Sequence, residues 1–220
     1  MNDTFNHIYR NSIWGNADNE TLSGSGSTKS INIFRNKFLS DFINENKIRL
    51  IVDICGDCNW QYEFMKLVNN KDVTYFGLDV SDYALNLAKE NNKHNRLTFS
   101  ENPINLCESE LICNDENSLI IIKEVIQHLP LDDGIKMLKN IKKSGIKYIA
   151  ITNHDKELFN SVNKNVEVGG FYPNNMFMPP FNFKNPLKDV NDIISGDSNK
   201  KGYGNLIIFN IQEQNEFEKE

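Results

Sequence analysis

Two short stretches of the chain carry residues whose types and spacing suit the binding of a nucleoside. The first runs from Val52 to Trp60 and places Gly56 just after an apolar run. A glycine there lets the backbone turn sharply and approach a bound molecule closely. The second stretch ends the next apolar run at Asp79, about two dozen residues downstream, where a carboxylate can accept hydrogen bonds from both hydroxyls of a ribose. Together they predict a cofactor that contains a nucleoside.

The same turn limits which cofactor is expected. It lacks the G-x-G-x-x-G pattern of nicotinamide enzymes and the G-K-[ST] ending of a phosphate-binding loop, and it offers few glycines to a pyrophosphate. A cofactor with a ribose but no phosphate fits better, and S-adenosylmethionine (SAM) is the common one. On spacing alone, an ordinary turn between a strand and a helix remains the alternative.

Two histidines are candidates for proton transfer. His128 follows an apolar run and shares its segment with Lys123, Glu124 and Gln127. An imidazole titrates near neutral pH, so His128 could remove a proton from an acceptor. His154 and Asp155 follow a later run and form a second candidate pair. The alternative is that each histidine has a structural role.

Cys55 and Cys58 form a C-x-x-C pair, which raises the alternative of a thiol oxidoreductase. A zinc site would need two more ligands, and Cys107 and Cys113 are spaced too widely for a zinc knuckle. We therefore expect no metal.

Strands and helices alternate along the chain and can position these residues. Short apolar runs predict strands, and apolar residues at helical spacing predict helices. The expected strands are 48–54, 73–80, 96–99, 118–123, 146–152 and 206–211, and the expected helices are 31–46, 62–68, 82–92 and 131–142, with Ser81 or Asp82 as an N-cap. This alternation predicts a doubly wound, mostly parallel sheet with ligands beyond the carboxyl ends of the strands. Residues 153–200 are expected to be irregular.

The first 30 residues are polar and include a Gly/Ser stretch from Ser23 to Thr28. One interpretation is a solvated linker. The other is a loop of backbone and hydroxyl donors that folds over the cofactor or cradles a phosphate. Aromatic residues at Trp14, Trp60, Phe171 and Tyr172 could wall the pocket, or could belong to the core.

Composition excludes several classes of function. The 220 residues contain 24 Lys and Arg against 30 Asp and Glu, a formal net charge of −6, which argues against a nucleic-acid partner. No apolar run reaches the roughly 18 residues of a membrane-spanning helix. The polar N-terminus lacks the apolar core of a signal peptide, so we expect a cytoplasmic protein whose cysteines are free thiols.

Four stretches resemble class I SAM-dependent methyltransferases, and most closely a bacterial group often associated with surface or capsular polysaccharide genes. Residues 55–60, Cys-Gly-Asp-Cys-Asn-Trp, resemble the end of that group's D-x-P-C-G-D-F-N-W loop. The other three are Trp14-Gly15 with Ser23–Thr28, the Lys123–Pro130 segment K-E-V-I-Q-H-L-P, and a tail of Gly169–Pro173, Met178–Phe183 and Pro186-Leu187. The resemblance covers residues 14 to about 190, and the tail is its most specific part.

The resemblance implies a seven-stranded Rossmann-like fold with an N-terminal helical segment. Residues 1–46 would cover the site, residues 47–220 would form the methyltransferase core, and residues 153–200 would lie on the acceptor side. We expect the cofactor to contact Cys55, Gly56, Asp57, Trp60, Asp79, Val80, Asn102, Pro103, Lys123 and Glu124. We expect the acceptor to contact Trp14, Ser25, Gly26, Ser27, Thr28, Gly169, Gly170 and Tyr172.

The chain departs from the group's pattern in two places. The loop is one residue shorter between Asp53 and Cys55, which puts the role of Asp53 in doubt. Tyr172 replaces the arginine of a G-G-W-R-P stretch, which affects expected substrate contacts.

The resulting expectation is methyl transfer from SAM to a small acceptor, with S-adenosylhomocysteine (SAH) as product. The favoured acceptor is a hydroxyl of a saccharide or of a nucleotide-activated precursor of a surface polysaccharide. The alternatives are an amine or phosphorylated metabolite, and an inactive scaffold protein, for which the shortened loop is the main argument.

Overall fold

The computed structural model describes residues 1–92, 97–113, 115–154, 162–191 and 205–217. Asp155, one of the expected acceptor-side residues, lies outside these ranges. The chain divides into two compact units, the first within residues 1–105 and the second from residue 106 onward. Each unit is described by itself.

The strands follow the order β3-β2-β1-β4-β5-β7-β6 in a seven-stranded, mostly parallel sheet, which confirms the expected fold class. The first unit holds β1 (Leu50–Ile54), β2 (Thr74–Leu78) and β3 (Leu97–Phe99), all parallel. Leu50 of β1 pairs with Thr74, and Tyr75 of β2 pairs with Leu97. Because parallel neighbours end at one edge, the residues after β1 and β2 are brought together.

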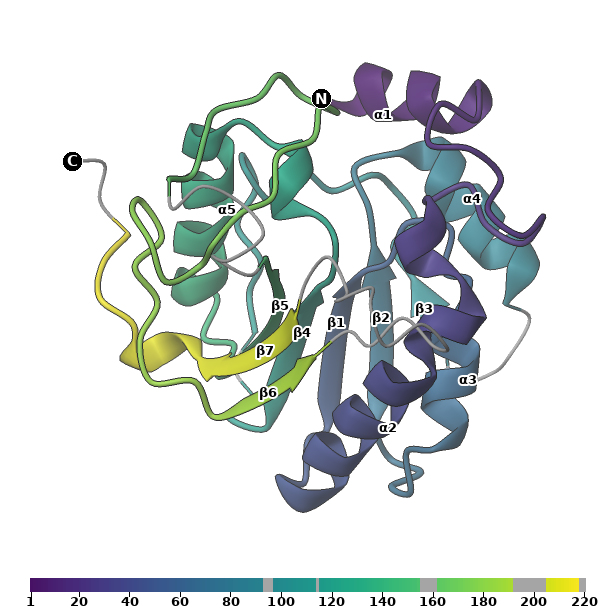
Figure 1. The fold of residues 1–220 in the computed structure, drawn as a ribbon. Coiled ribbons are helices and arrows are strands. Elements are labelled where there is room, and N and C mark those ends of the chain that lie inside the picture. The colour runs from purple at the N-terminus through teal and green to yellow at the C-terminus, as the bar shows by residue number, and fades with distance from the viewer. Residues whose placement is uncertain (93–96, 114, 155–161, 192–204, 218–220) are drawn as a thin grey trace. The chain divides into compact units, whose positions relative to one another are not determined.

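Helices of the first unit flank these strands (Figure 1). They are α1 (Asn2–Arg10), η1 (Ser25–Ser27), α2 (Lys29–Glu45), α3 (Gln61–Lys66) and α4 (Asp82–Asn91). α2 packs beside α3, and α1 packs beside α4. The expected N-cap at Ser81 is confirmed, since its Oγ accepts a hydrogen bond from the amide of Ala84 at 3.1 Å.

The N-terminal region differs from its interpretation as a linker. Its polar start forms α1, which buries Phe5, Ile8 and Tyr9 on one face. Apolar residues at positions i, i+3 and i+4 indicate a helix, but the polar composition of the first 30 residues drew attention away from this pattern. In α2, Leu39, Phe42 and Ile43 are buried, whereas Phe34 is exposed. The helix also buries Asn32, Arg35 and Asn36. Asn32 donates to the carbonyl of Thr28, and Arg35 donates to Asn32 Oδ1, which are contacts that an apolar pattern cannot anticipate.

The second unit continues the sheet with mixed strand directions. β4 (Ser118–Ile122) and β5 (Tyr148–Asn153) are parallel, whereas β7 (Asn205–Asn210) runs antiparallel to β5 and to β6 (Lys188–Asn191). Its helices are η2 (Ile126–His128), α5 (Leu131–Lys143) and η3 (Ile211–Glu213). The expectation that residues 153–200 hold only irregular chain is wrong at β6, whose four residues are mostly polar and pair with β7.

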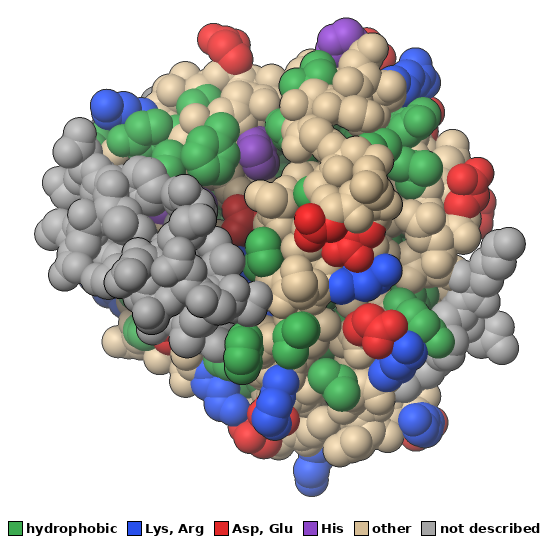
Figure 2. Space-filling view, turned by 45° about the vertical axis from the view of Figure 1, so that its right-hand side comes forward, with side chains coloured by type: hydrophobic (Ala, Val, Ile, Leu, Met, Phe, Trp, Pro, Cys, Tyr) green, Lys and Arg blue, Asp and Glu red, His purple; other side chains and the backbone are tan. Residues whose placement is uncertain are grey.

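The surface mixes charges of both signs. Figure 2 shows Lys and Arg side chains interspersed with Asp and Glu on the face that it draws. All four cysteines are free and buried, which confirms the expectation of free thiols. Within the described ranges, no helix is both long and apolar enough to cross a membrane.

Ser81 joins the cap of α4 to α1, because its Oγ also donates to Asn6 Oδ1 at 2.7 Å. We expect Ser81→Ala to lower the free energy of unfolding by about 1–2 kcal/mol, since an N-cap and a buried acceptor both lose their partner. Urea denaturation of both proteins measures the difference. Ser30→Ala, at an exposed position of α2, is the control and should change stability little. Equal losses in both variants would contradict the role given to Ser81.

Candidate functional site

The turn after β1 is shaped by Gly56. Its φ of +54° is a left-handed conformation that disfavours other residues. A Cβ on Gly56 would lie 2.6 Å from Ser23 Oγ and 2.8 Å from Tyr9 Oη. Two hydroxyls from the N-terminal region therefore lie directly against this turn, and only a residue without a side chain fits beneath them.

Asp79 lies beside the same turn, as its position after β2 predicts. Its Oδ2 accepts a hydrogen bond from the amide of Gly56 at 3.2 Å, and its Oδ1 accepts from the amide of Ser81 at 2.8 Å. Burial raises the pKa of Asp79 to about 6 even though these backbone donors act in the opposite direction. The structure thus brings together the glycine and the carboxylate on which the expected ribose site depends.

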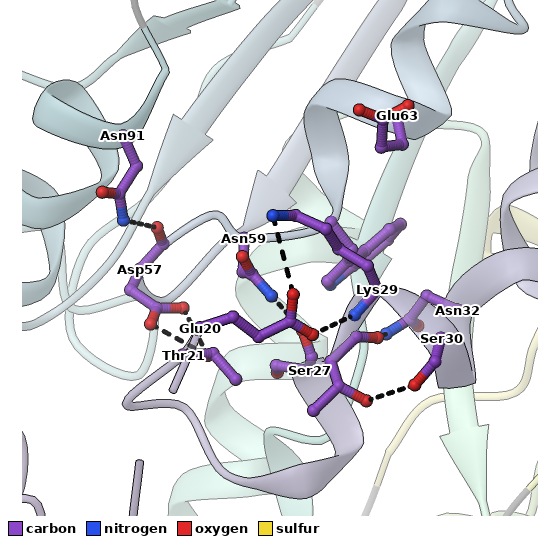
Figure 3. A network of polar contacts seen from close by, with 12 residues as sticks. Glu20, Thr21, Ser27, Lys29, Ser30, Asn32, Asp57, Asn59, Glu63 and Asn91 are labelled. Carbon is purple, nitrogen blue, oxygen red and sulfur yellow. Dashed lines mark hydrogen bonds and ion pairs between the residues drawn. The ribbon is translucent and has the colours of Figure 1, made fainter. Parts of the chain in front are cut away.

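The carboxylate of Asp57 binds residues 20–28, which we call the strap. Thr21 Oγ1 lies 3.0 and 2.9 Å from the two carboxylate oxygens, the amide of Leu22 donates at 2.7 Å, and Ser23 Oγ donates at 2.8 Å. Figure 3 shows Thr21 directed toward Asp57. Asp57 is itself buried. The side chain expected to contact the cofactor instead holds the strap on the turn.

The far end of the strap is fixed where α2 begins (Figure 3). The amide of Lys29 donates to Glu20 Oε1 at 2.7 Å, and Asn59 Nδ2 donates to the carbonyl of Ser27 at 3.0 Å. The amides of Ser27 and Thr28 donate to carbonyls within the strap. With these donors engaged inside the chain, the arrangement disfavours a phosphate cradle and favours a loop folded over the turn.

A polar network supports the turn from below. Asp53 is buried, and its Oδ2 accepts from Tyr75 Oη at 2.7 Å and from Gln61 Nε2 at 3.0 Å. Gln61 also donates to the carbonyl of Cys55 at 3.3 Å. The doubt over Asp53 is therefore resolved in favour of a supporting contact to the turn.

The C-x-x-C pair is poorly suited to redox chemistry. A hydrogen bond to Cys58 and burial raise the pKa of the Cys55 thiol well above its usual value. A reactive thiol instead needs a lowered pKa and exposure. Among the described residues, no group of three or more His, Cys, Asp or Glu side chains is placed to hold a metal.

The aromatic residues and the adenine-side residues expected in the first unit differ in how far they are buried. Trp60 is only 2% exposed and packs against Phe64, so it belongs to the core. Trp14 is half-buried and makes edge contacts with Tyr9. Beyond β3, Asn102 and Pro103 are exposed. The amide of the neighbouring Ile104 donates to the carbonyl of Asp79 at 2.8 Å, so this loop lies beside the carboxylate.

In the second unit, His128 meets the segment from Gly169 to Tyr172. Its Nδ1 lies 2.6 Å from the carbonyl oxygen of Gly170, and the amide of Gly169 donates to the carbonyl of His128 at 2.8 Å. Because a carbonyl only accepts, Nδ1 carries the proton and Nε2 is the basic nitrogen. Burial lowers the pKa of His128, so the imidazole is neutral near pH 7. The ring of Phe171, itself 56% exposed, lies 5.6 Å from that of His128.

His154 directly follows β5, as expected from the sequence. It is 2% exposed, and its Nδ1 accepts a hydrogen bond from the amide of Asn174 at 3.1 Å. Its own amide donates to the carbonyl of Asn174 at 2.9 Å. These contacts hold residue 174 against the end of β5, and they disfavour direct contact between His154 and an acceptor.

Lys123 and Glu124 follow β4 directly. Lys123 is buried, whereas Glu124 is half-buried and adopts a φ of +57°. A left-handed glutamate is uncommon, and such positions concentrate at functional sites. The amide of Glu124 donates to Thr152 Oγ1 at 2.9 Å, which ties the end of β4 to β5.

Four residues around the turn were not anticipated from the sequence: Tyr9, Thr21, Gln61 and Tyr75. Tyr9 could have been found from the apolar face of α1. Thr21 follows a tight turn in which Asp18 and Asn19 have φ values of 53° and 54°, and an Asp-Asn pair is a turn signal. Nothing local marks Gln61 or Tyr75, because both act through partners distant in sequence.

No protein-family model matches the sequence, and neither does any characterised protein. Several solved structures share the fold. The N-methyltransferase NodS of Bradyrhizobium japonicum WM9, in complex with SAH, superposes with a TM-score of 0.60 at 9% identity and covers 92% of this chain and 97% of its own. Magnesium protoporphyrin IX methyltransferase of Synechocystis PCC 6803, with bound SAM, gives a TM-score of 0.57 at 12% identity and covers 94% and 93%.

A third structure, a SAM-dependent methyltransferase of Anabaena variabilis, gives a TM-score of 0.58 at 12% identity and covers 94% of this chain and 93% of its own. At these identities the similarity is one of fold. The chain therefore has the fold of SAM-dependent methyltransferases.

Gly56 offers a direct test of the crowding at the turn. We expect Gly56→Ala to lower the free energy of unfolding by about 3 kcal/mol, since a left-handed alanine costs about 1–2 kcal/mol and the new methyl group overlaps two hydroxyls. Gly15→Ala is the matched control, because Gly15 has a φ of +83° with no atom within 4 Å. It carries the backbone cost alone. Denaturation curves that give equal losses in the free energy of unfolding for Gly56→Ala and Gly15→Ala would show that the added methyl group does not overlap the two hydroxyls.

Proposed function

We propose that the chain is a SAM-dependent methyltransferase acting on a small acceptor. The single observation that carries the proposal is the pairing of Gly56 with Asp79 at the ends of two adjacent parallel strands. A buried carboxylate beside a glycine suits a ribose and the chain attached to it. The shared fold with chains crystallised with SAM or SAH supports the same choice.

The residues around the turn fit this cofactor. Cys55 and Gly56 would face its methionine portion, and Asp79 would accept hydrogen bonds from the ribose hydroxyls. Val80 and the exposed Asn102 and Pro103 would contact the adenine. In the second unit, we propose a functional role for Lys123 and Glu124, with the left-handed backbone of Glu124 as the supporting observation.

Bound SAM supplies a methyl group on a sulfonium, which is already activated for in-line displacement. The protein therefore has mainly to align the acceptor and to manage its proton. We propose that His128 removes that proton through Nε2, because Nδ1 donates to the carbonyl of Gly170. The lowered pKa of His128 keeps this nitrogen unprotonated near neutral pH.

The proposed acceptor is a hydroxyl of a saccharide, or of a nucleotide-activated precursor of a surface polysaccharide. This choice comes from the sequence resemblance. The exposed ring of Phe171 beside His128 supports it, since a sugar ring can pack on an aromatic face. Lys164 lies over the ring of Tyr172 at 5.4 Å and offers a nearby positive charge to a phosphorylated precursor. Residues 153–200 would set acceptor specificity, and residues 1–46 would cover the cofactor.

Calorimetric titration with SAH tests the cofactor assignment. We expect wild-type protein to bind at micromolar concentration and Asp79→Ala to bind at least about 100-fold more weakly, because two hydrogen bonds to a charged group are lost. Asp72→Ala, at an exposed position before β2, is the control. Affinity should also fall as the pH drops through about 6, since Asp79 then gains a proton and accepts hydrogen bonds less well. No binding by wild-type protein at millimolar SAH would instead favour the scaffold alternative.

Transfer of a labelled methyl group from SAM to sugar-nucleotide acceptors tests His128. We expect His128→Asn to lower the turnover rate by about 10²–10⁴-fold while leaving the affinity for SAH unchanged. The wild-type rate should fall in acid, with a midpoint below pH 6.5, because protonation removes the base. His7→Asn, at an exposed position of α1, is the matched control. A full rate in His128→Asn would mean that the acceptor needs no base, as for a carboxylate or phosphate oxygen.

A further inference from the structure

The side chain of Asp57 holds residues 21–23 of the strap. Asp57 accepts hydrogen bonds from Thr21, Leu22 and Ser23 at 2.7–3.0 Å, all charge-assisted. Ser23 Oγ also lies 3.0 Å from Tyr9 Oη and 3.3 Å from the amide of Asp57. Ser23 is thus the point at which the strap, α1 and the glycine turn meet.

Both ends of the strap have attachments that do not involve Asp57. Before it, α1 is fixed to the residues that follow β2. Asn2 Nδ2 donates to the carbonyl of Val80 at 2.8 Å, and Asn6 Oδ1 accepts from the amide of Tyr83 at 3.2 Å. Within the strap, Glu20 accepts from the amide of Lys29 at the start of α2, and Asn59 donates to the carbonyl of Ser27. The carbonyl of Thr21 accepts from the amide of Ala17, and Ser23 contacts Tyr9. If the contacts to Asp57 were broken, residues 21–23 would lose their charge-assisted hydrogen bonds while the flanking helices kept their own contacts.

Ser23 of the strap lies against Gly56 in the proposed cofactor site. Ser23 Oγ would be 2.6 Å from a Cβ on Gly56, and the amide of Gly56 donates to Asp79. Asp79 is 8% exposed and Asp57 is 2% exposed with the strap in place. Ser23 therefore covers the side of Gly56 toward which a Cβ would point, and it does so together with Tyr9.

We propose that Asp57 is a positioning residue that closes the strap over bound cofactor and thereby sets the rate of cofactor exchange. This inference rests on the proposed function. It replaces the sequence-based expectation that Asp57 contacts the cofactor, because three donors of the strap already occupy its carboxylate. Opening the strap breaks these bonds and leaves a buried carboxylate without them, so exchange is slow unless the strap is loosened.

The test measures dissociation of tritiated SAH from the full chain after dilution into excess unlabelled SAH. In Thr21→Val/Ser23→Ala the strap loses both hydroxyl donors to Asp57, together with the contacts of these hydroxyls to the amide of Ser23 and to Tyr9. We expect dissociation at least about tenfold faster than in wild-type protein. Ser109→Ala, which changes an exposed serine of the second unit, should dissociate at the wild-type rate. If the strap had only a structural role, the double variant would have a lower melting temperature but the same dissociation rate as wild-type protein.

Asp57→Asn separates the two roles of this residue. If Asp57 is a positioning residue, Asp57→Asn should still bind SAH. It should release SAH faster than wild-type protein, as the double variant does. Loss of SAH binding in Asp57→Asn, with a wild-type dissociation rate in the double variant, would overturn the inference and make Asp57 a cofactor ligand. If wild-type protein binds no SAH, the proposed function fails. If it binds and the double variant matches it, only the role of the strap fails.

Discussion

The absence of a side chain at Gly56 is the constraint on which the first unit depends. It lets the hydroxyls of Tyr9 and Ser23 and the carboxylate of Asp79 converge on one backbone turn. The turn is also supported from beneath, where Asp53 and Gln61 hold the backbone of Cys55. A larger residue would have to displace either the strap or the strand ends. The site is therefore a property of the packing around one backbone position.

In the second unit, backbone contacts orient the imidazole of His128. The carbonyl of Gly170 takes the Nδ1 proton of His128, and paired backbone hydrogen bonds hold the Gly169–Tyr172 segment beside η2. The same kind of contact gives His154 another role, since its Nδ1 accepts from a buried amide. Two histidines that look equivalent in sequence thus differ in their surroundings, because His154 is buried whereas His128 combines a basic Nε2 with partial exposure.

Local signals predicted much of this arrangement. The apolar runs before Gly56 and Asp79 placed both residues at strand ends, and the N-cap at Ser81 followed from its residue type. What the sequence did not reveal depends on distant partners. The buried polar face of α2 needs acceptors in the strap, and β6 becomes a strand only because β7 offers it hydrogen bonds. Asp57 was predicted to contact the cofactor from the motif that contains it, yet its contacts come from residues 21–23, far away in sequence and without any periodic pattern.

The central claim is that the glycine turn, Asp79 and the strap form a site for SAM and SAH. Amide hydrogen exchange of the wild-type chain, with and without saturating SAH, tests it most directly because it locates the binding. We expect slower exchange in peptides that cover residues 21–28, 55–60 and 79–81, and little change in α5, whose amides lie in the second unit. Unchanged exchange in those three peptides at saturating SAH would contradict it.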